Sequence, residues 1–337
     1  MRQKARLELN VLFTSVGRRV ELMRAFRDAY SRLKICGHIV ATDIDPLAPA
    51  LQVVDRPYMV PPLTDSRYIP TLIEICRRER IDLVFPLIDP DIPVLAAHRK
   101  EIEATGAKLV VVSTHAAKIA ADKWRTMAFF QSLGLPTPKS WLPDQVSVED
   151  LQFPVFIKPR RGSAAKHAFK VDNPDALWFF ISYVPDPIIQ EYLSGPEVTN
   201  DIICNLNGNV LGVASRKRIE VRWGEVAKGV TIRDQIILDA CIKIAQALPA
   251  VGPITVQCIL KDGIPHFTEI NARMGGGLPL AIAAGVDAPL WLLADFAGLK
   301  VDIPPLGTYR EGLYMTRFDD SFFLEEKDHE KMEGCRV

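Results

Sequence analysis

The sequence predicts an α/β fold in its first third and an α+β fold with antiparallel sheets in the remainder. Two observations lead to this prediction. Short apolar runs alternate with amphipathic helical segments between residues 9 and 112, a pattern typical of a doubly wound parallel sheet. Later in the chain, apolar runs are joined by short turns that contain glycine, as in antiparallel hairpins.

Length and composition limit the classes of protein. A chain of 337 residues is long enough for two or three compact units. Lys plus Arg and Asp plus Glu both number 41, so no net charge favours nucleic acid or an acidic membrane. The six cysteines show no paired spacing and most stand among apolar residues, which predicts free thiols and a cytoplasmic protein. We expect no transmembrane span and no secretion signal.

In the N-terminal third, Gly17 stands at the first strand-to-helix turn and Asp43 ends the second strand. A dinucleotide site needs three glycines at this turn, and only Gly17 is present. A nicotinamide-dependent oxidoreductase therefore remains an alternative that rests on Gly17 and Asp43 alone. Asp89 and Asp91 follow the strand that ends at Phe85, where open α/β sheets bind ligands. Capping of the next helix is the simpler interpretation of both acids, and we prefer it. The strands are expected at residues 9–15, 38–42, 58–60, 83–85 and 108–112.

Two lysines and a loop of small residues follow. Lys123 lies at the start of a helix that closes at residues 134–138, and Lys158 lies at the polar end of a strand over residues 153–159. The loop at residues 160–166 combines cations with Gly162, and such a loop can close over phosphates through its backbone N–H groups. The alternative is a basic surface hairpin.

The next segment suits a nucleotide cleft. A strand from Pro187 leads into a short crossover containing Gly195, and two carboxylates, Glu191 and Glu197, stand six residues apart. Adenine could meet the backbone there, and ribose a carboxylate. The sequence 207–209, Asn-Gly-Asn, predicts a type I′ hairpin turn.

Positive charge gathers next on two strands. No aromatic residues are interleaved with these cations, which argues against stacking on nucleic acid and leaves strand-surface solvation as the simple alternative. We expect a helix over residues 234–248, another over 278–284 and a last strand over 312–318. The charged residues of this region are Arg216, Lys217, Arg218, Arg222, Glu225 and Lys228.

A late hairpin carries the most informative pattern. Two apolar runs flank residues 261–263, which predicts a three-residue turn, and this turn length would place Gln257, Glu269 and Asn271 on one face. Carboxylate and amide oxygens are ligands that Mg²⁺ takes beside nucleotide phosphates. Arg273 follows on the same parity, where it could neutralise a transferring phosphoryl group. The alternative is a polar, solvated hairpin face.

Taken in order, these motifs resemble the ATP-grasp superfamily, and most of all the branch built like the large subunit of carbamoyl phosphate synthetase. The resemblance implies a Rossmann-like domain over residues 1–112, a two-lobed ATP-grasp domain with antiparallel sheets over 113–305, and a C-terminal strand and tail over 306–337. Within the ATP-grasp domain it implies a small lobe with a lid loop over 113–190 and a metal-binding lobe over 191–305.

The resemblance also implies a site. Arg273 and Lys228 would face the transferred phosphoryl group and an anionic substrate, and the N-terminal domain would line the acceptor site weakly through Ser15, Gly17, Arg18 and Asp43. Mg²⁺, or Mn²⁺ in its place, would be bound by Gln257, Glu269 and Asn271. Contacts to ATP would come from Lys123, Lys158, Gly162, Ser163, Gln190, Glu191, Tyr192, Leu193 and Glu197. The lid departs from the family pattern, because Ala164, Ala165 and His167 stand where glycine or small residues are usual.

The function that this resemblance implies is an ADP-forming ligase. A carboxylate oxygen would attack the γ-phosphoryl group of ATP, and an amine or similar nucleophile would take the acyl group from the resulting acyl phosphate. The expected partners are ATP, a small carboxylate and a nucleophilic acceptor, without nucleic acid or membrane; a homodimer is left open. The alternative, which the altered lid motivates, is an ATP-binding regulatory or assembly protein with weak or no turnover.

Overall fold

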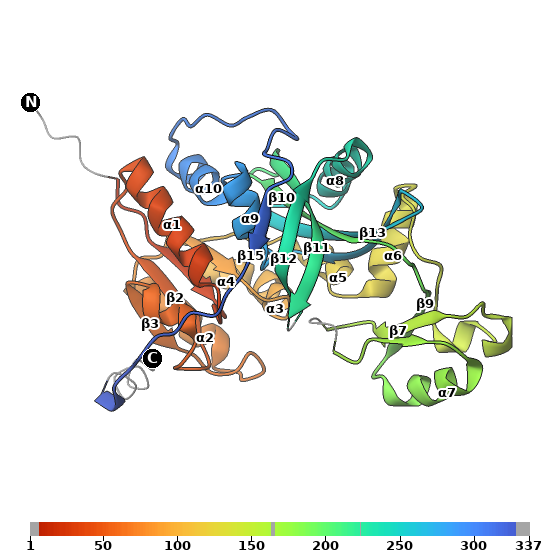
Figure 1. Ribbon diagram of the computed structural model, residues 1–337. Helices are drawn as coiled ribbons and strands as arrows, with labels where there is room; N and C mark the ends of the chain where they lie inside the picture. Colours follow the sequence, from red (N-terminus) through yellow and green to blue (C-terminus); the bar gives the residue numbers. More distant parts are fainter. Residues whose placement is uncertain (1–6, 163–165, 223, 328–337) are drawn as a thin grey trace, which may run out of the picture.

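The computed structural model of the protein describes residues 7–162, 166–222 and 224–327, which form three sheets (Figure 1). The first sheet is parallel, with strand order β3-β2-β1-β4-β5, so the doubly wound α/β fold predicted for the N-terminal third is confirmed. Its strands are β1 (Val11–Thr14), β2 (Ile39–Asp43), β3 (Arg56–Met59), β4 (Leu83–Pro86) and β5 (Lys108–Leu109).

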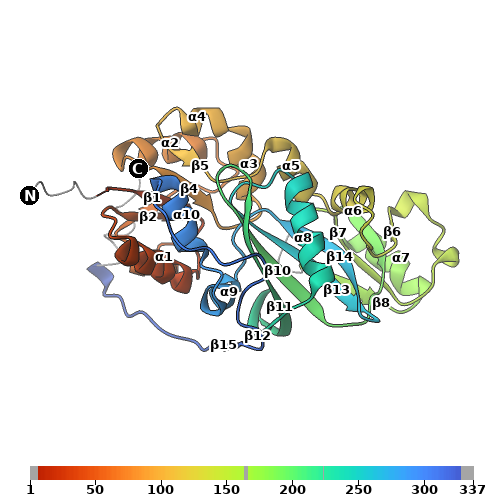
Figure 2. The same ribbon diagram turned by 90° about the horizontal axis from the view of Figure 1, so that it is seen from above.

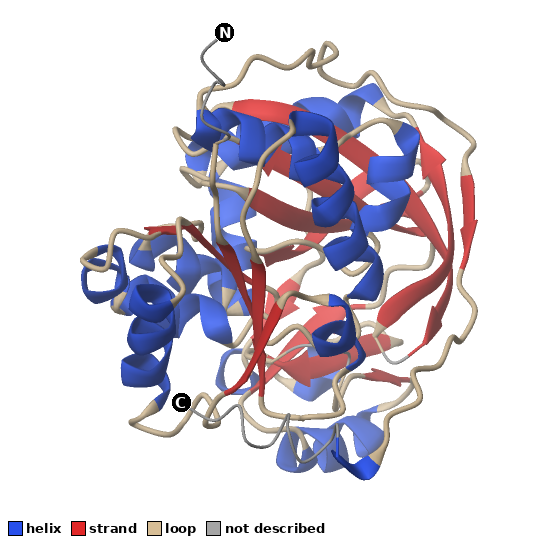
Figure 3. Ribbon diagram, turned by 90° about the vertical axis from the view of Figure 1, so that its left-hand side faces the viewer, coloured by secondary structure: helices blue, strands red, loops and turns tan. Residues whose placement is uncertain are grey.

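Both faces of the parallel sheet are buried, because helices cover each of them (Figure 3). Alternate side chains of β1 enter different cores: Val11 and Phe13 pack with residues of α1, whereas Leu12 packs with residues of α2. The helices of this part are α1 (Val20–Leu33), α2 (Tyr68–Arg78), α3 (Asp91–Ala97) and α4 (Arg99–Glu103), with a 3-10 turn, η1, at Pro49–Val53.

The second sheet is antiparallel, has the order β14-β13-β10-β11-β12-β15, and forms the large lobe. Helix α8 packs on this sheet, and α9 and α10 lie between the sheet and α1 (Figure 2). The strands are β10 (Glu197–Cys204), β11 (Val210–Arg222), β12 (Glu225–Ile232), β13 (Pro253–Lys261), β14 (Ile264–Asn271) and β15 (Tyr314–Thr316). The helices are α8 (Gln235–Ala247), α9 (Leu278–Ala284) and α10 (Ala288–Ala297).

The third sheet is also antiparallel, with the order β6-β9-β7-β8, and forms the small lobe. Helix α7 (Pro174–Tyr183) packs on it through the fully buried Leu177, and the lobe has a core of its own. The strands are β6 (Ser140–Trp141), β7 (Val155–Pro159), β8 (Phe169–Val171) and β9 (Pro187–Glu191), with 3-10 turns η2 (Pro143–Gln145) and η3 (Val148–Asp150). Helices α5 (Thr114–Ala120) and α6 (Lys123–Ser132) lead into the lobe from the N-terminal part.

In the late hairpin, Gln257 lies on the same face as Glu269, as predicted, but the turn is shorter than predicted. Lys261 pairs with Ile264, so the turn has two residues, and Asp262 (φ 52°) and Gly263 (φ 78°) both take the left-handed conformation. The prediction of a three-residue turn is therefore wrong. The register then shifts between Gln257 and Cys258, and this irregularity places Gln257 opposite Glu269. A bulge thus restores the parity that the shorter turn would have reversed.

Two other local predictions are wrong. The β10–β11 connection is a hairpin, but of Asn207, Gly208 and Asn209 only Gly208 has a positive φ (86°), whereas a type I′ turn needs two such residues. Asp89 and Asp91 do not cap α3, because the cap position is Pro90 and makes no side-chain capping bond.

No single described helix is long and apolar enough to cross a membrane. The pair α9–α10 meets the length and composition requirement only when its two helices, bent by 82°, are counted together.

Candidate functional site

A lysine at the start of α6 meets the carboxylate of the late hairpin. Lys123, the first residue of α6, places its Nζ 3.8 Å from Glu269 Oε1 and donates a hydrogen bond of 2.8 Å to the Gly162 carbonyl. Glu269 in turn accepts a hydrogen bond of 2.8 Å from the Gln257 amide nitrogen, when this amide is oriented with its nitrogen toward Glu269 and its oxygen toward Arg218. The base of the predicted lid therefore touches the lysine that faces the predicted metal ligand.

Lys158 belongs to the same cluster, although it comes from β7 of the small lobe. Burial lowers the pKa of Lys158 to about 8; the charges of Glu269 and Glu197 oppose this shift, and the charge of Lys123 adds to it. Lys158 therefore lies within electrostatic range of Glu269, Glu197 and Lys123. The buried ammonium of Lys158 has lost part of its hydration. A bound phosphate would stabilise its charged form, so Lys158 is suited to bind a phosphate.

Arg160 and Arg161, at the start of the predicted lid loop, form ion pairs. Arg160 Nη2 donates to Asp122 Oδ2 (2.7 Å), and Asp122 also caps α6 by accepting from the Trp124 N–H (3.0 Å). Arg161 Nη1 donates to Asp186 Oδ2 (2.8 Å). The base is therefore tied to α6, the helix that carries Lys123. Ser163, Ala164 and Ala165 lie outside the described residues.

The predicted nucleotide-contacting residues 190–193 span the end of β9. Gln190 is buried and donates to Ser140 Oγ (2.8 Å), Leu193 is buried, and the exposed Tyr192 ring lies 5.1 Å from Lys170 Nζ. The Glu191 N–H donates to the Lys139 carbonyl (2.9 Å). Of these side chains, Leu193 alone is both apolar and buried, so a nucleotide base would meet mostly backbone here.

Glu197 begins β10 and forms an ion pair with Arg218 of the neighbouring strand β11. Arg218 also lies 3.3 Å from the amide oxygen of Gln257. The carboxylate predicted to bind ribose is thus already linked to the predicted metal-binding residues.

A cavity of about 210 Å³ lies between the N-terminal sheet and the large lobe. Its lining is rich in arginine and contains the glycine run at residues 275–277, and its two carboxylates each pair with an arginine. The charged lining residues are Arg18, Arg19, Asp89, Arg216, Arg218, Glu225 and Arg273. Five cations against two anions make this cavity suited to an anionic ligand.

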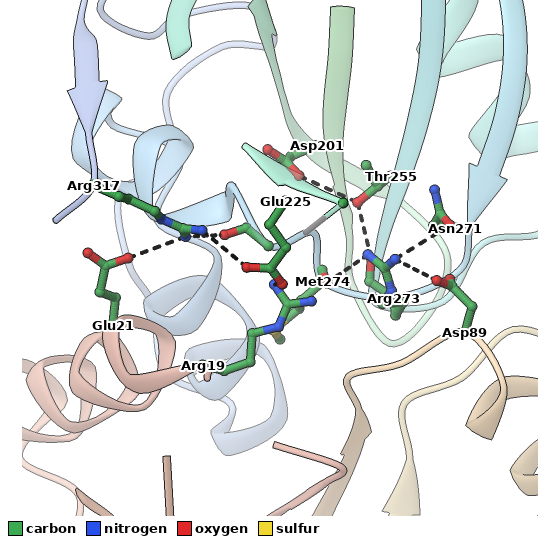
Figure 4. Close-up of polar contacts among 12 residues, drawn as sticks. Arg19, Glu21, Asp89, Asp201, Glu225, Thr255, Asn271, Arg273, Met274 and Arg317 are labelled. Carbon is green, nitrogen blue, oxygen red and sulfur yellow. Dashed lines mark hydrogen bonds and ion pairs between the residues drawn. The ribbon is translucent and has the colours of Figure 1, made fainter. Parts of the chain in front are cut away.

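Two ion pairs join the domains across this cavity (Figure 4). Arg273, after β14, donates from Nη2 to Asp89 Oδ2 (2.6 Å), an acid of the N-terminal sheet. Arg19, at the start of α1, places Nη1 3.2 Å from Glu225 Oε1 of β12. Burial lowers the pKa of Arg19 to about 10, and Glu225 opposes the shift. Asp89 therefore serves the site rather than its own helix.

Arg216 stands on the floor of the same cavity. It is buried and forms an ion pair with the buried Asp201, and burial together with the neighbouring arginines lowers the pKa of Arg216 to about 9. Gly277 allows this packing, because a Cβ at that position would lie 2.4 Å from Arg216 Nε. Residues 275–277 thus bring backbone close to the arginines.

Lys228 does not join the site. Its Nζ pairs with Glu220 Oε2 (2.7 Å), and it lines neither this cavity nor the second one described below. Lys228 pairs in register with Glu220 while the next residue, Gly229, pairs with Arg218, so strand alternation points Lys228 to the face opposite Arg218. The contacts of Lys228 therefore give no support to its predicted role toward an anionic substrate, whereas Arg216 and Arg218 line the first cavity.

A second cavity, of about 250 Å³, adjoins the first and shares Asp89 and Asn271 with it. Lys123, Gly162 and Glu269 line it, together with apolar residues of α5. Among the described residues, no group of three or more His, Cys, Asp or Glu side chains could hold a metal ion. A cation here would therefore rest on Glu269, amide oxygens and groups of a bound ligand, which is the pattern of Mg²⁺ beside phosphates rather than of zinc.

The first strand-to-helix turn is occupied by its own contacts. Asp43 Oδ2 accepts from the Gly17 N–H (2.8 Å), and Asp43 Oδ1 accepts from the Ile44 N–H (2.8 Å). Asp91 accepts from Thr14 Oγ1 (2.6 Å) and from Ser15 Oγ (2.9 Å), and burial raises the pKa of Asp91 to about 6. The carboxylate that a dinucleotide ribose would need is thus bound to the chain's own backbone.

Sequence reasoning missed three residues around the first cavity, namely Arg19, Asp201 and Arg317. Arg19 follows Gly17 and Arg18 at the strand-to-helix turn, which is the one signal that could have drawn attention to it. Asp201 pairs with Arg216 of the adjacent strand β11, but no local pattern predicts that both side chains are buried. Nothing local marks Arg317 in the C-terminal segment, because its partner Glu225 lies far away in the sequence.

Two family models match the chain: "PylC-like, N-terminal domain" over residues 11–110 and "ATP-grasp domain" over residues 120–277. The D-alanine–D-alanine ligase of Fusobacterium nucleatum is 34% identical over 189 residues, covering 52% of this chain and 63% of the relative. The carbamoyl-phosphate synthase of Methanobrevibacter smithii is 26% identical over 159 residues, covering 45% and 42%. The chain thus spans less than two thirds of either relative.

Solved structures share the fold at low identity. The biotin carboxylase domain of the Hydrogenobacter thermophilus 2-oxoglutarate carboxylase superposes with a TM-score of 0.73 at 18% identity, covering 90% of this chain and 73% of that one. The L-amino acid ligase of Bacillus licheniformis gives a TM-score of 0.67 at 19% identity, covering 86% and 74%. At such identities the likeness establishes the fold alone, and the predicted combination of a parallel N-terminal sheet with two antiparallel sheets is confirmed.

Proposed function

Because this chain belongs to the ATP-grasp superfamily, we propose that it is an ATP- and Mg²⁺-dependent ligase that joins a carboxylate to an amine or similar nucleophile. The reaction would pass through an acyl phosphate and release ADP. Relatives named as D-alanine–D-alanine ligases and a structural neighbour named as an L-amino acid ligase support this class of reaction.

The observation that carries the proposal is the meeting of Lys158, Lys123 and Glu269. Lys123 Nζ lies 3.8 Å from Glu269 Oε1, and the charge of Glu269, in the large lobe, favours the charged form of Lys158, in the small lobe. Because Arg218 pairs with Glu197, the two ammonium groups and Glu269 leave an excess of positive charge at the junction of the lobes, which suits the phosphates of ATP. The base of the lid contacts Lys123 and could enclose those phosphates.

Mg²⁺ fits the late hairpin, which offers one half-buried carboxylate and two amide side chains on neighbouring strands. Glu269, Gln257 and Asn271 would hold the ion, because Mg²⁺ commonly takes one or two carboxylates together with phosphate oxygens. The bound ion would supply neutralisation of the phosphate charge.

Other residues would position the nucleotide. In the proposal the adenine lies against residues 190–193, and Glu197 faces the ribose. Since Glu197 already pairs with Arg218, ribose binding would share or shift that ion pair. Lys158 and Lys123 bind phosphate oxygens, and Gly162 lets the lid backbone approach them.

The arginine-lined cavity would hold the carboxylate substrate, which accepts the phosphoryl group. Arg216 and Arg218 attract the anion, and Arg273, fixed by Asp89, faces the phosphoryl group in transfer. A carboxylate oxygen attacks the γ-phosphorus in line, the bond to the β–γ bridging oxygen breaks, and ADP leaves. An amine then attacks the acyl carbon, loses a proton and displaces phosphate. Positioning and charge neutralisation would supply the rate enhancement.

The proposal is tested by an ADP-release screen over pairs of small carboxylates and amines, with AMP monitored in parallel. We expect ADP, with no AMP, for at least one pair in the presence of Mg²⁺, and loss of this activity in Glu269→Ala. Production of AMP would contradict the acyl-phosphate route. Calorimetric ATP binding without ADP release across the whole panel would favour the regulatory or assembly protein.

A further inference from the structure

Arg317 joins three separate parts of the molecule. It follows β15, and its backbone N–H donates to the Ala227 carbonyl (2.9 Å). Its guanidinium lies 3.2 Å from Glu225 Oε2 through Nη1 and 3.3 Å from Glu21 Oε2 through Nη2, and Nη2 also donates to the Gly276 carbonyl (Figure 4). One side chain therefore contacts β12, α1 and the glycine run.

Two of these contacts form part of the wall of the arginine-lined cavity. Glu225 and Gly276 both line the cavity. The Glu225 carboxylate pairs with Arg317 through Oε2 and, through Oε1, with Arg19, which also lines the cavity. Although burial opposes the charge of Glu225, Arg19 and Arg317 hold the pKa of its carboxyl below the usual value. Glu225 is thus a fixed anion between an arginine of the N-terminal domain and an arginine of the C-terminal segment.

The packing of this wall is close. A Cβ at residue 276 would lie 2.4 Å from Arg19 Nη1 and 2.8 Å from the carboxylate carbon of Glu225, so the ion pair closes directly over the glycine backbone. The side chain of Arg317 is only 24% exposed. A guanidinium has rigid, forked donors and can hold a carboxylate and a carbonyl at once, which an ammonium does less well.

We propose that Arg317 is a positioning residue for this cavity, which on the proposed function is the acceptor site. By holding Glu225 and the Gly276 carbonyl, it fixes the wall against which Arg19 packs. The segment after β15, which leaves the large sheet and passes the start of α1, is then a working part of the site (Figure 1). It lies beyond residues 120–277, where the ATP-grasp family model matches.

Hydrogen–deuterium exchange tests the positioning without any substrate. In Arg317→Gln, we expect amide exchange over residues 224–228 and 275–278 to rise about tenfold or more, because the local opening loses its ionic ties. Arg32→Gln is the matched control: Arg32 also links α1 to a distant acid, with Nη1 2.7 Å from Asp287 Oδ2, but it does not line the cavity. Unchanged exchange in Arg317→Gln, or an equal rise over these residues in Arg32→Gln, would overturn the proposal.

Kinetics separate positioning from general loosening. With the fastest carboxylate–amine pair from the ADP-release screen, Arg317→Gln should raise the KM for the carboxylate about 10- to 100-fold, an effect typical of a small misplacement. The Kd of Mg·ADP should change less than about twofold, since the contacts of Arg317 lie away from Lys123 and Lys158. Arg317→Lys should recover part of the loss by keeping the charge.

An equal loss of Mg·ADP affinity, or no recovery in Arg317→Lys, would count against positioning. If no pair turns over, the proposed function fails, and the exchange experiment alone decides whether Arg317 fixes the wall.

Discussion

The small lobe has a hydrophobic core of its own, whereas the cores on both faces of the N-terminal sheet continue into the large lobe. On one face, Leu12 of β1 belongs to the same core as Ile202 of β10; on the other, Phe13 shares a core with Trp291 of α10. The N-terminal sheet and the large lobe are therefore built as one body, and the small lobe is attached to it.

The two parts of the candidate site differ in the same way: one lies within the single body, and the other includes a residue of the small lobe. The arginine-lined cavity lies inside the single body, between Arg19 and Asp89 of the N-terminal part and Arg216 and Arg273 of the large lobe. Lys158 comes from the attached lobe, which meets the body through polar contacts such as those of Asp122 and Lys123. We infer that the acceptor side is preorganised, while the nucleotide side can close by movement of the small lobe.

The largest effect is expected where the two regions meet. Glu269→Ala removes the one carboxylate of the predicted metal set, and we expect ADP production to fall at least about 1,000-fold, or about 4 kcal/mol in transition-state stabilisation. The melting temperature should change little, because Glu269 is half-buried in a polar cleft. The measurement is steady-state ADP release with thermal unfolding as control; near-normal turnover would refute the metal assignment.

The separateness of the small-lobe core is tested by Leu177→Ala. Loss of this fully buried side chain should cost about 2–5 kcal/mol, confined to the small lobe. Limited proteolysis and hydrogen exchange should then show opening of residues 140–191 while β1 and β10 stay protected. The matched variant Phe13→Ala, in a shared core, should instead lower the stability of the whole body by about 3–5 kcal/mol. Equal loosening of both regions by Leu177→Ala would show that the cores are coupled.

A smaller effect is expected from the titration of Lys158. Its pKa is lowered to about 8, so the ammonium is charged below that pH and loses its charge as the pH rises through it. The affinity for a non-hydrolysable ATP analogue with Mg²⁺ should accordingly weaken about tenfold between pH 7 and pH 9. Calorimetry over this range gives the answer, and Lys158→Arg should remove the dependence because arginine stays charged. A flat profile in the unaltered protein would exclude Lys158 from phosphate binding.

The smallest effect is expected on the outer face of the large lobe. Lys228→Met should leave ADP release within about twofold of the unaltered protein, because a half-exposed surface ion pair contributes little. Arg216→Met, one strand away and inside the cavity, is the contrasting variant and should lose most activity. Similar losses in both would mean that the face assignment from strand register is mistaken.

Sequence reasoning predicted the elements well because each has a local cause. The alternation of buried strands with amphipathic helices is visible in the first third, and Asp234 and Asp122 mark the starts of α8 and α6 as capping residues. The motifs that bring Lys123, Lys158 and Glu269 together are likewise short and ordered along the chain.

The sheet face on which each side chain lies was harder to predict. It depends on β-bulges, which cannot be found by counting alternate residues along a strand. The late hairpin kept Gln257 opposite Glu269 only because a bulge compensates for a shorter turn. In β11 the register shifts between Arg218 and Glu220, and this shift places Lys228 on the face opposite Arg218, which the sequence does not reveal. A single inserted residue reverses every side chain beyond it.

The arginine-lined cavity was the part of the site that was hardest to predict from the sequence. The partners of Arg273 and Arg317 lie 184 residues and 92 residues away, in Asp89 and Glu225. No local pattern marks Asp89 for an ion pair rather than a helix cap, since an acid after a strand suits both. Only the packing of the N-terminal sheet on the large lobe decides between them.

The central claim is that a nucleotide binds between Lys158 of the small lobe and Glu269 of the large lobe. Hydrogen–deuterium exchange with and without a non-hydrolysable ATP analogue and Mg²⁺ tests it most directly. We predict simultaneous protection of residues 155–162 and 267–273, with little change at the Gly17 turn of the N-terminal sheet. Protection confined to that turn, or protection in neither lobe at saturating analogue, would contradict the account.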